Sequence, residues 1–322
     1  METAWTLDRL VRLTMEKNTI KYDCLLLLTA FIWGFGFVAQ RSGMEYIGPY
    51  LFNGIRFALG SFVLIPLLFK EVKKPIQQSP DFAPINNGMK FLAGIFAGII
   101  LFSAASFQQV GLVYTTAGNA GFITGLYVII VPILGIFLGT RPGPGNWTGA
   151  ILASFGLYLL CIKGSFSTSF GDILQLAGAF LWAIHVLFIG WISPRSSPIL
   201  TAFMQFATCS VFSLVTAFYL EDISIVSIFN ASIPLIYGGA LSVGVGYTLQ
   251  VVAQTKSKPT HAAIILSLEG AFAALGGWLI LGEVLSPRGI AGCCLMLSGM
   301  IISQLWALLQ VWVNERHSKK NI

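Results

Sequence analysis

The fold is decided by the stretch Phe91–Thr140, which reads FLAGIFAGIILFSAASFQQVGLVYTTAGNAGFITGLYVIIVPILGIFLGT. These fifty residues contain no Asp, Glu, Lys or Arg. A transmembrane helix needs about 20 mainly apolar residues, so a charge-free stretch of this length predicts two helices that each cross a bilayer. We expect the break between them at residues 114–118, where YTTAG interrupts the apolar run.

The composition of the whole chain agrees with that stretch. Of its 322 residues, 56% are hydrophobic and 10% are charged, whereas a soluble domain carries about 45–50% apolar and about 25% charged residues. These values exclude a soluble enzyme, a disordered chain and a disulfide scaffold. A membrane β-barrel would show alternating segments of about ten residues instead of long apolar runs. The sequence therefore predicts an all-α integral membrane protein.

Gaps between charged residues divide the chain into ten predicted transmembrane helices. These cover residues 22–40, 49–69, 91–112, 117–138, 146–162, 173–192, 198–219, 232–254, 261–281 and 287–309. Residues 1–21 and 310–322 are predicted to be tails.

The basic residues predict the orientation, because cytoplasmic loops are enriched in Lys and Arg. With the N-terminus in the cytoplasm, 15 of the 19 basic residues fall on the cytoplasmic side. The outer loops then hold Arg41, Lys163 and Arg288, and Arg56 lies within a helix. Both termini are therefore expected to be cytoplasmic, and the net charge of +6 is explained by topology and by attraction to anionic lipid. We expect no nucleic-acid partner.

The two halves of the chain repeat each other. Trp33 and Trp182 lie in similar settings, 149 positions apart. The same offset pairs Pro49 with Pro198, Arg56 with Gln205 and Phe57 with Phe206; an offset of 143 pairs Leu138 with Leu281, Gly149 with Gly292 and Gly156 with Gly299. Residues 22–163 and 172–309 are thus two five-helix repeats. An odd number of spans in each repeat forces the halves to be inverted in the membrane, a plan that recurs in secondary transporters.

Several motifs in order make the chain similar to the EamA family of the drug/metabolite transporter superfamily. They are Trp33-Gly34 in the first helix, Arg56 in the second, GFITGLY at 121–127 with Pro132 in the fourth, and Leu268-Glu269 followed by GGWLILGE at 276–283 in the ninth. The resemblance implies ten helices, cytoplasmic termini and a central cavity lined by helices one, three, four, six, eight and nine. It also implies transport of small metabolites, often outward.

Three ionisable residues are predicted deep in the membrane, where such groups are costly and are functional candidates by default. Burial disfavours the charged form of a carboxylate, so Glu269 is a candidate for proton coupling, or else for fixing helix packing. Arg56 must find a carbonyl, a carboxylate or a substrate anion, and a tie to a neighbouring helix is the alternative to a binding role. His185 is either a proton-sensitive group or a satisfied hydrogen-bonding residue.

Uncharged polar and aromatic residues near the middle of the helices are candidates for the cavity lining. They are Trp33, Gln108, Gln109, Asn119, Thr124, Tyr127, Trp182, Tyr247 and Gln250. Together they suit a mostly apolar pocket with a few orienting polar groups. Each of them could instead form a hydrogen bond between helices.

The function predicted from the sequence is secondary transport of small organic metabolites, such as amino acids or amphiphilic solutes, across the plasma or inner membrane. Export is the favoured direction, and coupling to protons through Glu269 is the favoured drive. The partners are then a small-molecule substrate and the lipid bilayer, and no cofactor or metal is expected. Three alternatives stay open: an exchanger of sugar phosphates or nucleotide sugars with the same fold, a membrane scaffold, and an intramembrane enzyme. The enzyme is disfavoured because no Asp lies mid-span, with Asp23 and Asp172 placed as caps at helix starts.

Overall fold

The computed structural model describes residues 2–71, 85–161, 169–282, 284 and 287–320, and this part of the chain is helical with no β-strand. The helices of the first half are α1 (Glu2–Gly43), α2 (Pro49–Glu71), α3 (Asn87–Tyr114), α4 (Ala117–Gly125), α5 (Tyr127–Phe137) and α6 (Pro144–Cys161). The second half contains α7 (Phe170–Ile192), η1 (Ser193–Arg195), α8 (Pro198–Leu220), α9 (Ile225–Asn230), α10 (Ser232–Ile236), η2 (Tyr237–Tyr247), α11 (Thr248–Ala253), α12 (Pro259–Leu266), α13 (Glu269–Leu281) and α14 (Pro287–Lys320).

Eight segments of the described chain are long and apolar enough to cross a membrane. They are residues 20–43, 49–70, 87–114, 117–137, 170–195, 198–220, 232–253 and 259–281. Each overlaps one of the predicted helices. The remaining two predicted helices, at 146–162 and 287–309, correspond to α6 and α14, which are helical but are not among these eight. Residues 2–21, predicted as a tail, continue the helix of α1.

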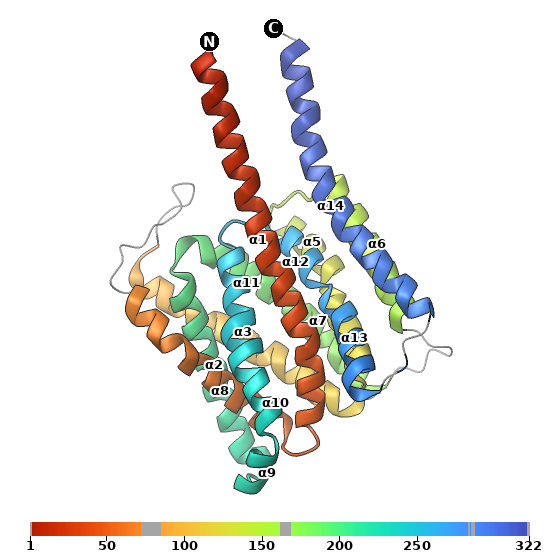
Figure 1. Ribbon diagram of the computed structural model, residues 1–322. Helices are drawn as coiled ribbons and strands as arrows, with labels where there is room; N and C mark the ends of the chain where they lie inside the picture. The colour runs from red at the N-terminus through yellow and green to blue at the C-terminus, as the bar shows by residue number, and fades with distance from the viewer. Residues whose placement is uncertain (1, 72–84, 162–168, 283, 285–286, 321–322) are drawn as a thin grey trace.

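Helix contacts of one half have counterparts in the other half. α1 packs against η2, α11, α12 and α13, whereas α7 packs against α3, α4 and α5. α2 contacts α8, and α6 lies alongside α14 at one edge of the bundle (Figure 1). The start of α1 and the end of α14 lie at the same end of the molecule (Figure 1).

In two of the membrane-crossing segments a turn interrupts the α-helix near its middle, and in a third, residues 232–253, part of the helix is a π-helix. A turn at Leu126 separates α4 from α5, and a turn at 267–268 separates α12 from α13. The break between α4 and α5 lies six residues before Pro132, which sits inside α5. Residues 237–247 of the third segment form the π-helix η2, a form that often occurs at functional sites.

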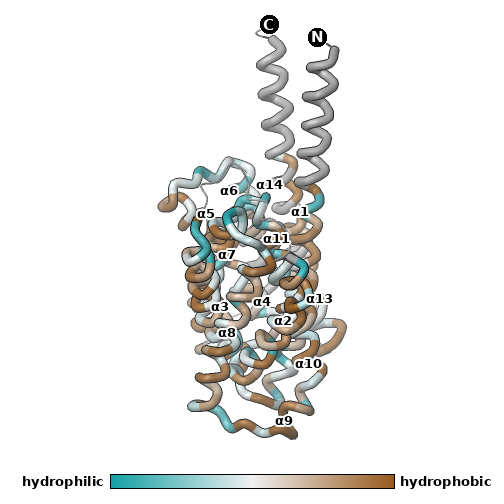
Figure 2. The backbone as a smooth tube through the Cα atoms, turned by 90° about the vertical axis from the view of Figure 1, so that its left-hand side faces the viewer, coloured by the Kyte–Doolittle hydropathy of each residue, from teal (hydrophilic) through white to brown (hydrophobic). Residues whose placement is uncertain are grey.

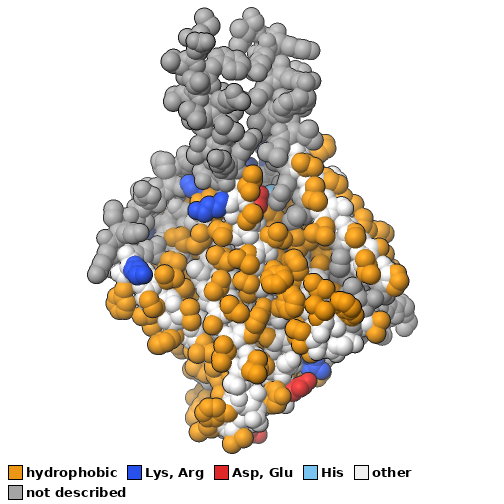
Figure 3. Space-filling view, in the orientation of Figure 1, with side chains coloured by type: hydrophobic (Ala, Val, Ile, Leu, Met, Phe, Trp, Pro, Cys, Tyr) orange, Lys and Arg blue, Asp and Glu red, His pale blue; other side chains and the backbone are white. Residues whose placement is uncertain are grey.

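The outer surface is largely apolar. Large hydrophobic side chains are exposed on most of the long helices, among them Phe62, Leu92, Phe137 and Phe218. Figure 3 shows them covering the middle of one face, while the charged side chains visible there lie toward its ends. In the hydropathy-coloured trace of Figure 2, hydrophobic (brown) stretches recur along the membrane-crossing helices, between white and some teal ones. A bilayer is the solvent that such a surface requires.

Candidate substrate-binding cavity

A narrow cavity lies in the middle of the bundle, between the two halves of the chain. Its lining is Trp33, Phe37, Gln40, Gln108, Thr124, Tyr127, Trp182, Val186, Ser242, Tyr247, Gln250 and Glu269. The elements that contribute these side chains are α1, α3, α4, α5, α7, η2, α11 and α13, which correspond to the six helices that the family resemblance implied. In this conformation the side chains leave room only for water-sized molecules.

The π-helix η2 brings its residues against α1. Nε1 of Trp33 donates a hydrogen bond to the Ser242 carbonyl oxygen at 3.2 Å, and Oγ1 of Thr29 donates to the Gly246 carbonyl at 3.3 Å. A Cβ atom at Gly246 would lie 2.7 Å from the Trp33 Nε1 atom, so only glycine permits this approach. Glycine and the wide π turn together fix the Trp33 ring at the cavity.

Aromatic rings form one wall of the cavity. The ring centroid of Tyr247 lies 4.4 Å from that of Trp33 and 5.9 Å from that of Trp182. Phe57 and Phe206 pack behind Tyr247, with centroids at 5.9 and 6.0 Å. The lining rings are therefore held by a second layer of buried rings.

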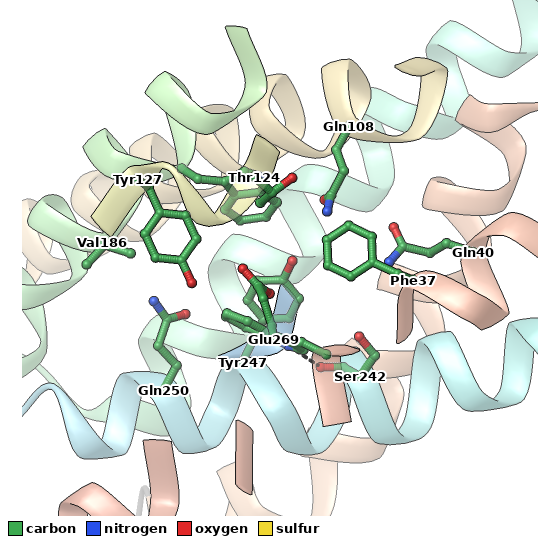
Figure 4. Close-up of a pocket in the computed structure, with 12 residues that line it drawn as sticks. Phe37, Gln40, Gln108, Thr124, Tyr127, Val186, Ser242, Tyr247, Gln250 and Glu269 are labelled. Carbon is green, nitrogen blue, oxygen red and sulfur yellow. Dashed lines mark hydrogen bonds between the residues drawn. The ribbon is translucent and has the colours of Figure 1, made fainter. Parts of the chain in front are cut away.

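Among the described residues that line the cavity, Glu269 is the only charged one. It is the first residue of α13 and follows directly on the turn that interrupts this membrane segment. Its carboxyl group and the Tyr127 hydroxyl point toward each other across the cavity, with the Gln250 amide beside them (Figure 4). The break between α12 and α13 therefore places an acidic group at the centre of the molecule, at the start of a half-helix, where the helix dipole favours negative charge.

Several polar atoms at the cavity have no hydrogen-bond partner among the described residues. They are Gln40 Oε1, Tyr127 Oη, Trp182 Nε1, Gln250 Oε1, Gln250 Nε2 and Glu269 Oε1. Buried polar atoms are normally satisfied by protein or by bound molecules. A group of six such atoms around one cavity indicates that a polar ligand or water completes the site.

Hydrogen bonds to one side chain and two backbone oxygens of the lining residues connect the helices around the cavity. Thr124 Oγ1 donates to Gln175 Oε1 at 3.3 Å, and Gln175 Nε2 donates to the backbone carbonyl oxygen of Gln108 at 2.7 Å. Gln109, which does not line the cavity, donates through Nε2 to the Gln40 carbonyl oxygen at 3.3 Å. These bonds tie α7 to α4 and α3, and α3 to α1, around the cavity.

Arg56 is buried outside the cavity lining. Nε of Arg56 donates to Asn53 Oδ1 at 2.9 Å, and Asn53 Nδ2 donates to the Ala105 carbonyl oxygen at 3.0 Å. The guanidinium also lies 4.9 Å from the ring centroid of Phe57. The arginine thus belongs to a polar chain between α2 and α3, while its Nη2 has no hydrogen-bond partner among the described residues.

His185 and Asn119 also lie outside the lining. Nε2 of His185 is 2.8 Å from Gln205 Oε1, and its ring meets that of Trp182 edge-on at 5.6 Å. The histidine therefore supports the cavity wall from behind. Asn119 is half-buried in the first turn of α4, where its backbone amide donates to the N-capping Thr116.

Most of the predicted lining residues surround the cavity: Trp33, Gln108, Thr124, Tyr127, Trp182, Tyr247, Gln250 and Glu269. The sequence did not single out Phe37, Gln40, Val186 and Ser242. Phe37 and Gln40 lie four and seven residues after Trp33 on the same helix face, a spacing that could have identified both. Val186 follows the same rule from Trp182, whereas Ser242 carries no comparable signal. Among the described residues, no group of three His, Cys, Asp or Glu side chains is arranged to hold a metal.

Comparison with known proteins gives consistent matches over both halves. The model of the EamA-like transporter family matches residues 20–162 and again 169–305. An "Uncharacterized transporter" of Archaeoglobus fulgidus is 32% identical over 88% of this chain and 85% of its own length. A "Probable amino-acid metabolite efflux pump" of Salmonella typhimurium is 25% identical over 87% of this chain and 93% of its own length. One solved crystal structure, 17% identical, superposes with a TM-score of 0.67 over 89% of this chain and 98% of that one, which shows a shared fold.

Proposed function

Because the chain belongs to the EamA-like transporter family, we propose that it is a secondary transporter that exports small organic metabolites across the cell membrane by alternating access. The observation that carries this proposal is the central cavity, whose lining comes from both halves and holds six unpartnered polar atoms. Substrate sites of inverted-repeat transporters lie near the bilayer midplane, at discontinuous helices. The breaks beside Tyr127 and Glu269 fit that plan.

The proposed topology has ten transmembrane helices, in two inverted halves, with both termini in the cytoplasm. It is supported by the exchange of helix contacts between the halves and by the start of α1 and the end of α14 lying at one end (Figure 1). The distribution of Lys and Arg supports the cytoplasmic assignment of that end. In this topology α6 and α14 are the fifth and tenth helices.

Glu269 is the group through which the proposed transporter couples to protons. It lies in a membrane-embedded cavity whose described lining residues include no basic side chain. A carboxyl group in such surroundings can exchange a proton with either side as the cavity opens. The narrowness of the cavity means that helices must move apart before a solute can enter or leave, which is the motion that alternating access requires.

Liposomes that contain the purified full chain test the function. Counterflow of radiolabelled amino acids, amines and sugars is measured with and without an imposed pH gradient. We expect saturable counterflow of at least one compound, accelerated by the gradient. Absence of counterflow across the whole panel would leave a membrane scaffold as the better assignment.

The proton coupling is tested with Glu269→Gln, which keeps the size of the side chain and removes its titratable group. We expect this variant to lose its response to the pH gradient, whereas Glu45→Gln, at an exposed glutamate outside the cavity, keeps it. Full, gradient-dependent transport by Glu269→Gln would overturn the coupling role.

A phosphate exchanger of the same fold is not favoured. Recognition of a phosphate group relies on Arg or Lys side chains, and none of the twelve lining residues is basic. The deep arginine, Arg56, is engaged with Asn53 outside the cavity.

A further inference from the structure

Resting on the transport function proposed above, we propose that the cavity selects a small organic amine in its charged ammonium form, without a carboxylate. The carboxylate of Glu269 supplies the opposite charge. The rings of Trp33, Trp182 and Tyr247 supply the wall against which the ammonium group lies.

Charge is the first argument. The twelve described residues that line the cavity include one acidic side chain and no basic one. An isolated carboxylate is costly in a low-dielectric site, and a cation that approaches it recovers much of that cost. An anionic solute would instead bring a second negative charge next to Glu269.

The aromatic wall is the second argument. A cation is attracted to the faces of Trp and Tyr, and groups of such rings are the usual binding sites for ammonium ligands. Here the Tyr247 ring packs against both tryptophan rings, with centroid distances of 4.4 Å to Trp33 and 5.9 Å to Trp182. All three rings line the same cavity as Glu269. An uncharged solute would gain only their apolar contact.

Hydrogen bonding is the third argument. Glu269 Oε1, Gln250 Oε1 and Gln40 Oε1 are acceptors that have no donor among the described residues. A primary ammonium group has donors only and can satisfy such acceptors. The amide nitrogen of Gln250 and Nε1 of Trp182 also lack partners, and they suit a hydroxyl or carbonyl oxygen elsewhere on the amine.

The position of Arg56 favours an amine over an amino acid as the solute. A zwitterion would need a cation for its carboxylate, close to the site of its ammonium group. Arg56 does not line the cavity; its guanidinium packs on Phe57, its Nε bonds to Asn53, and its Nη2, which has no partner among the described residues, lies outside the lining as well. Since Phe57 itself packs behind Tyr247, the arginine lies one layer away from the solute.

Binding of three matched probes to the purified full chain tests the proposal by isothermal titration calorimetry. Phenethylamine is a cation, 2-phenylethanol replaces its ammonium group with a hydroxyl, and phenylalanine adds a carboxylate. We expect phenethylamine to bind about tenfold more tightly than either of the others, the effect of one desolvated cation–π or ion-pair contact. Equal or tighter binding of 2-phenylethanol or phenylalanine, or no binding of phenethylamine, would overturn the proposal.

Variants assign the selectivity to Glu269. Glu269→Gln is expected to bind phenethylamine no better than 2-phenylethanol, whereas Glu269→Asp, which keeps the charge, and the distant Glu45→Gln retain the preference. Binding of 2-phenylethanol by Glu269→Gln at wild-type affinity shows that the variant is folded. A preference for the amine that survives in Glu269→Gln would contradict the proposal.

Failure of this inference is distinguishable from failure of the transport function. If liposomes exchange a panel compound but the purified chain does not prefer phenethylamine, the amine selectivity is wrong and the transport proposal stands. If phenethylamine binds as expected but no panel compound is exchanged, the transport proposal is wrong and the amine selectivity stands.

Discussion

Asn53 is the residue that ties a buried cation to the rest of the bundle. Its side-chain oxygen accepts from Arg56 at 2.9 Å, and its side-chain nitrogen donates to Ala105 of α3 at 3.0 Å. Truncation at Asn53 removes both bonds and leaves the guanidinium without this acceptor. We expect Asn53→Ala to lower the free energy of unfolding by about 2 kcal/mol, the cost of leaving a buried polar group unsatisfied.

That loss is measured by reversible unfolding in detergent micelles, with the exposed Asn87→Ala as the control of matched chemistry. Asn87→Ala should stay close to wild type. If Asn53→Ala is equally stable, the polar chain between α2 and α3 does not hold these helices together.

Glu221 caps a helix that lies far away in the sequence. Its two carboxylate oxygens accept from the backbone amides of Tyr50 and Leu51, each at 2.8 Å, at the start of α2. A charged cap at a helix N-terminus contributes about 1 kcal/mol. Glu221→Gln should therefore lower the stability by about that amount, whereas the neighbouring, exposed Asp222→Asn should not. The thermal unfolding temperatures of the two variants, measured side by side with the wild type, test this difference.

At the scale of elements, two glycine pairs let α6 and α14 lie in close contact. A Cβ atom at Gly149 would lie 2.8 Å from the Gly299 carbonyl oxygen, and one at Gly299 would lie 2.7 Å from the Gly149 oxygen. Gly156 makes the corresponding approach to the backbone of Gly292. Under the 143-residue offset Gly149 corresponds to Gly292 and Gly156 to Gly299. The contact between Gly149 and Gly299 therefore corresponds to the contact between Gly292 and Gly156.

This contact predicts whether a conservative substitution raises or lowers the stability of the protein. Ala favours a helix over Gly by about 1 kcal/mol, so Gly149→Ala would stabilise an isolated helix. Here the added methyl group meets backbone, and we expect a net loss of thermal stability in detergent. Gly143→Ala, where a Cβ atom has nothing within 4 Å, is the control. A stabilised Gly149→Ala variant would refute the close packing.

The membrane-crossing segments could be predicted from the sequence because bilayer thickness requires a minimum apolar length, which gaps between charges reveal. Most of the cavity lining was also predictable, since polar and aromatic residues are rare at mid-membrane depth. The turns at Leu126 and 267–268 and the π-helix at 237–247 were not, because each lies inside one continuous apolar segment, whose length gives no sign of an internal break. Asp23 was predicted as a helix cap. The prediction was wrong, since α1 begins at Glu2 and Asp23 pairs instead with His261 at 2.9 Å.

At the scale of the whole molecule, the two equivalent aspartates lie at opposite ends of the bundle. The Asp23 carboxylate contacts the His261 ring, and this contact joins α1 to α12 at the end where the chain starts. Asp172, 149 positions later, accepts from Thr115 at 3.1 Å, which joins α7 to the junction of α3 and α4 at the other end. Both contacts connect membrane-crossing segments that contribute to the cavity lining, the segment 259–281 through its second half, α13. The proposed alternating access therefore requires each contact to open in turn.

Cross-linking the ends of α1 and α12 tests that requirement. The variant carries Asp23→Cys and His261→Cys in a background whose five cysteines are replaced by Ser, and a short bifunctional thiol reagent joins the two new thiols in liposomes. We expect counterflow to stop when the reagent is added and to return on reduction, while either single substitution remains insensitive to it.

The matched control joins Asn146→Cys of α6 to Ser303→Cys of α14, whose native side chains lie 3.1 Å apart and outside the cavity lining. Because this second link does not cross the cavity, it should leave counterflow intact. Unchanged counterflow with the first link closed would mean that solute leaves the cavity without separation of α1 from α12, and alternating access by these helices would have to be abandoned.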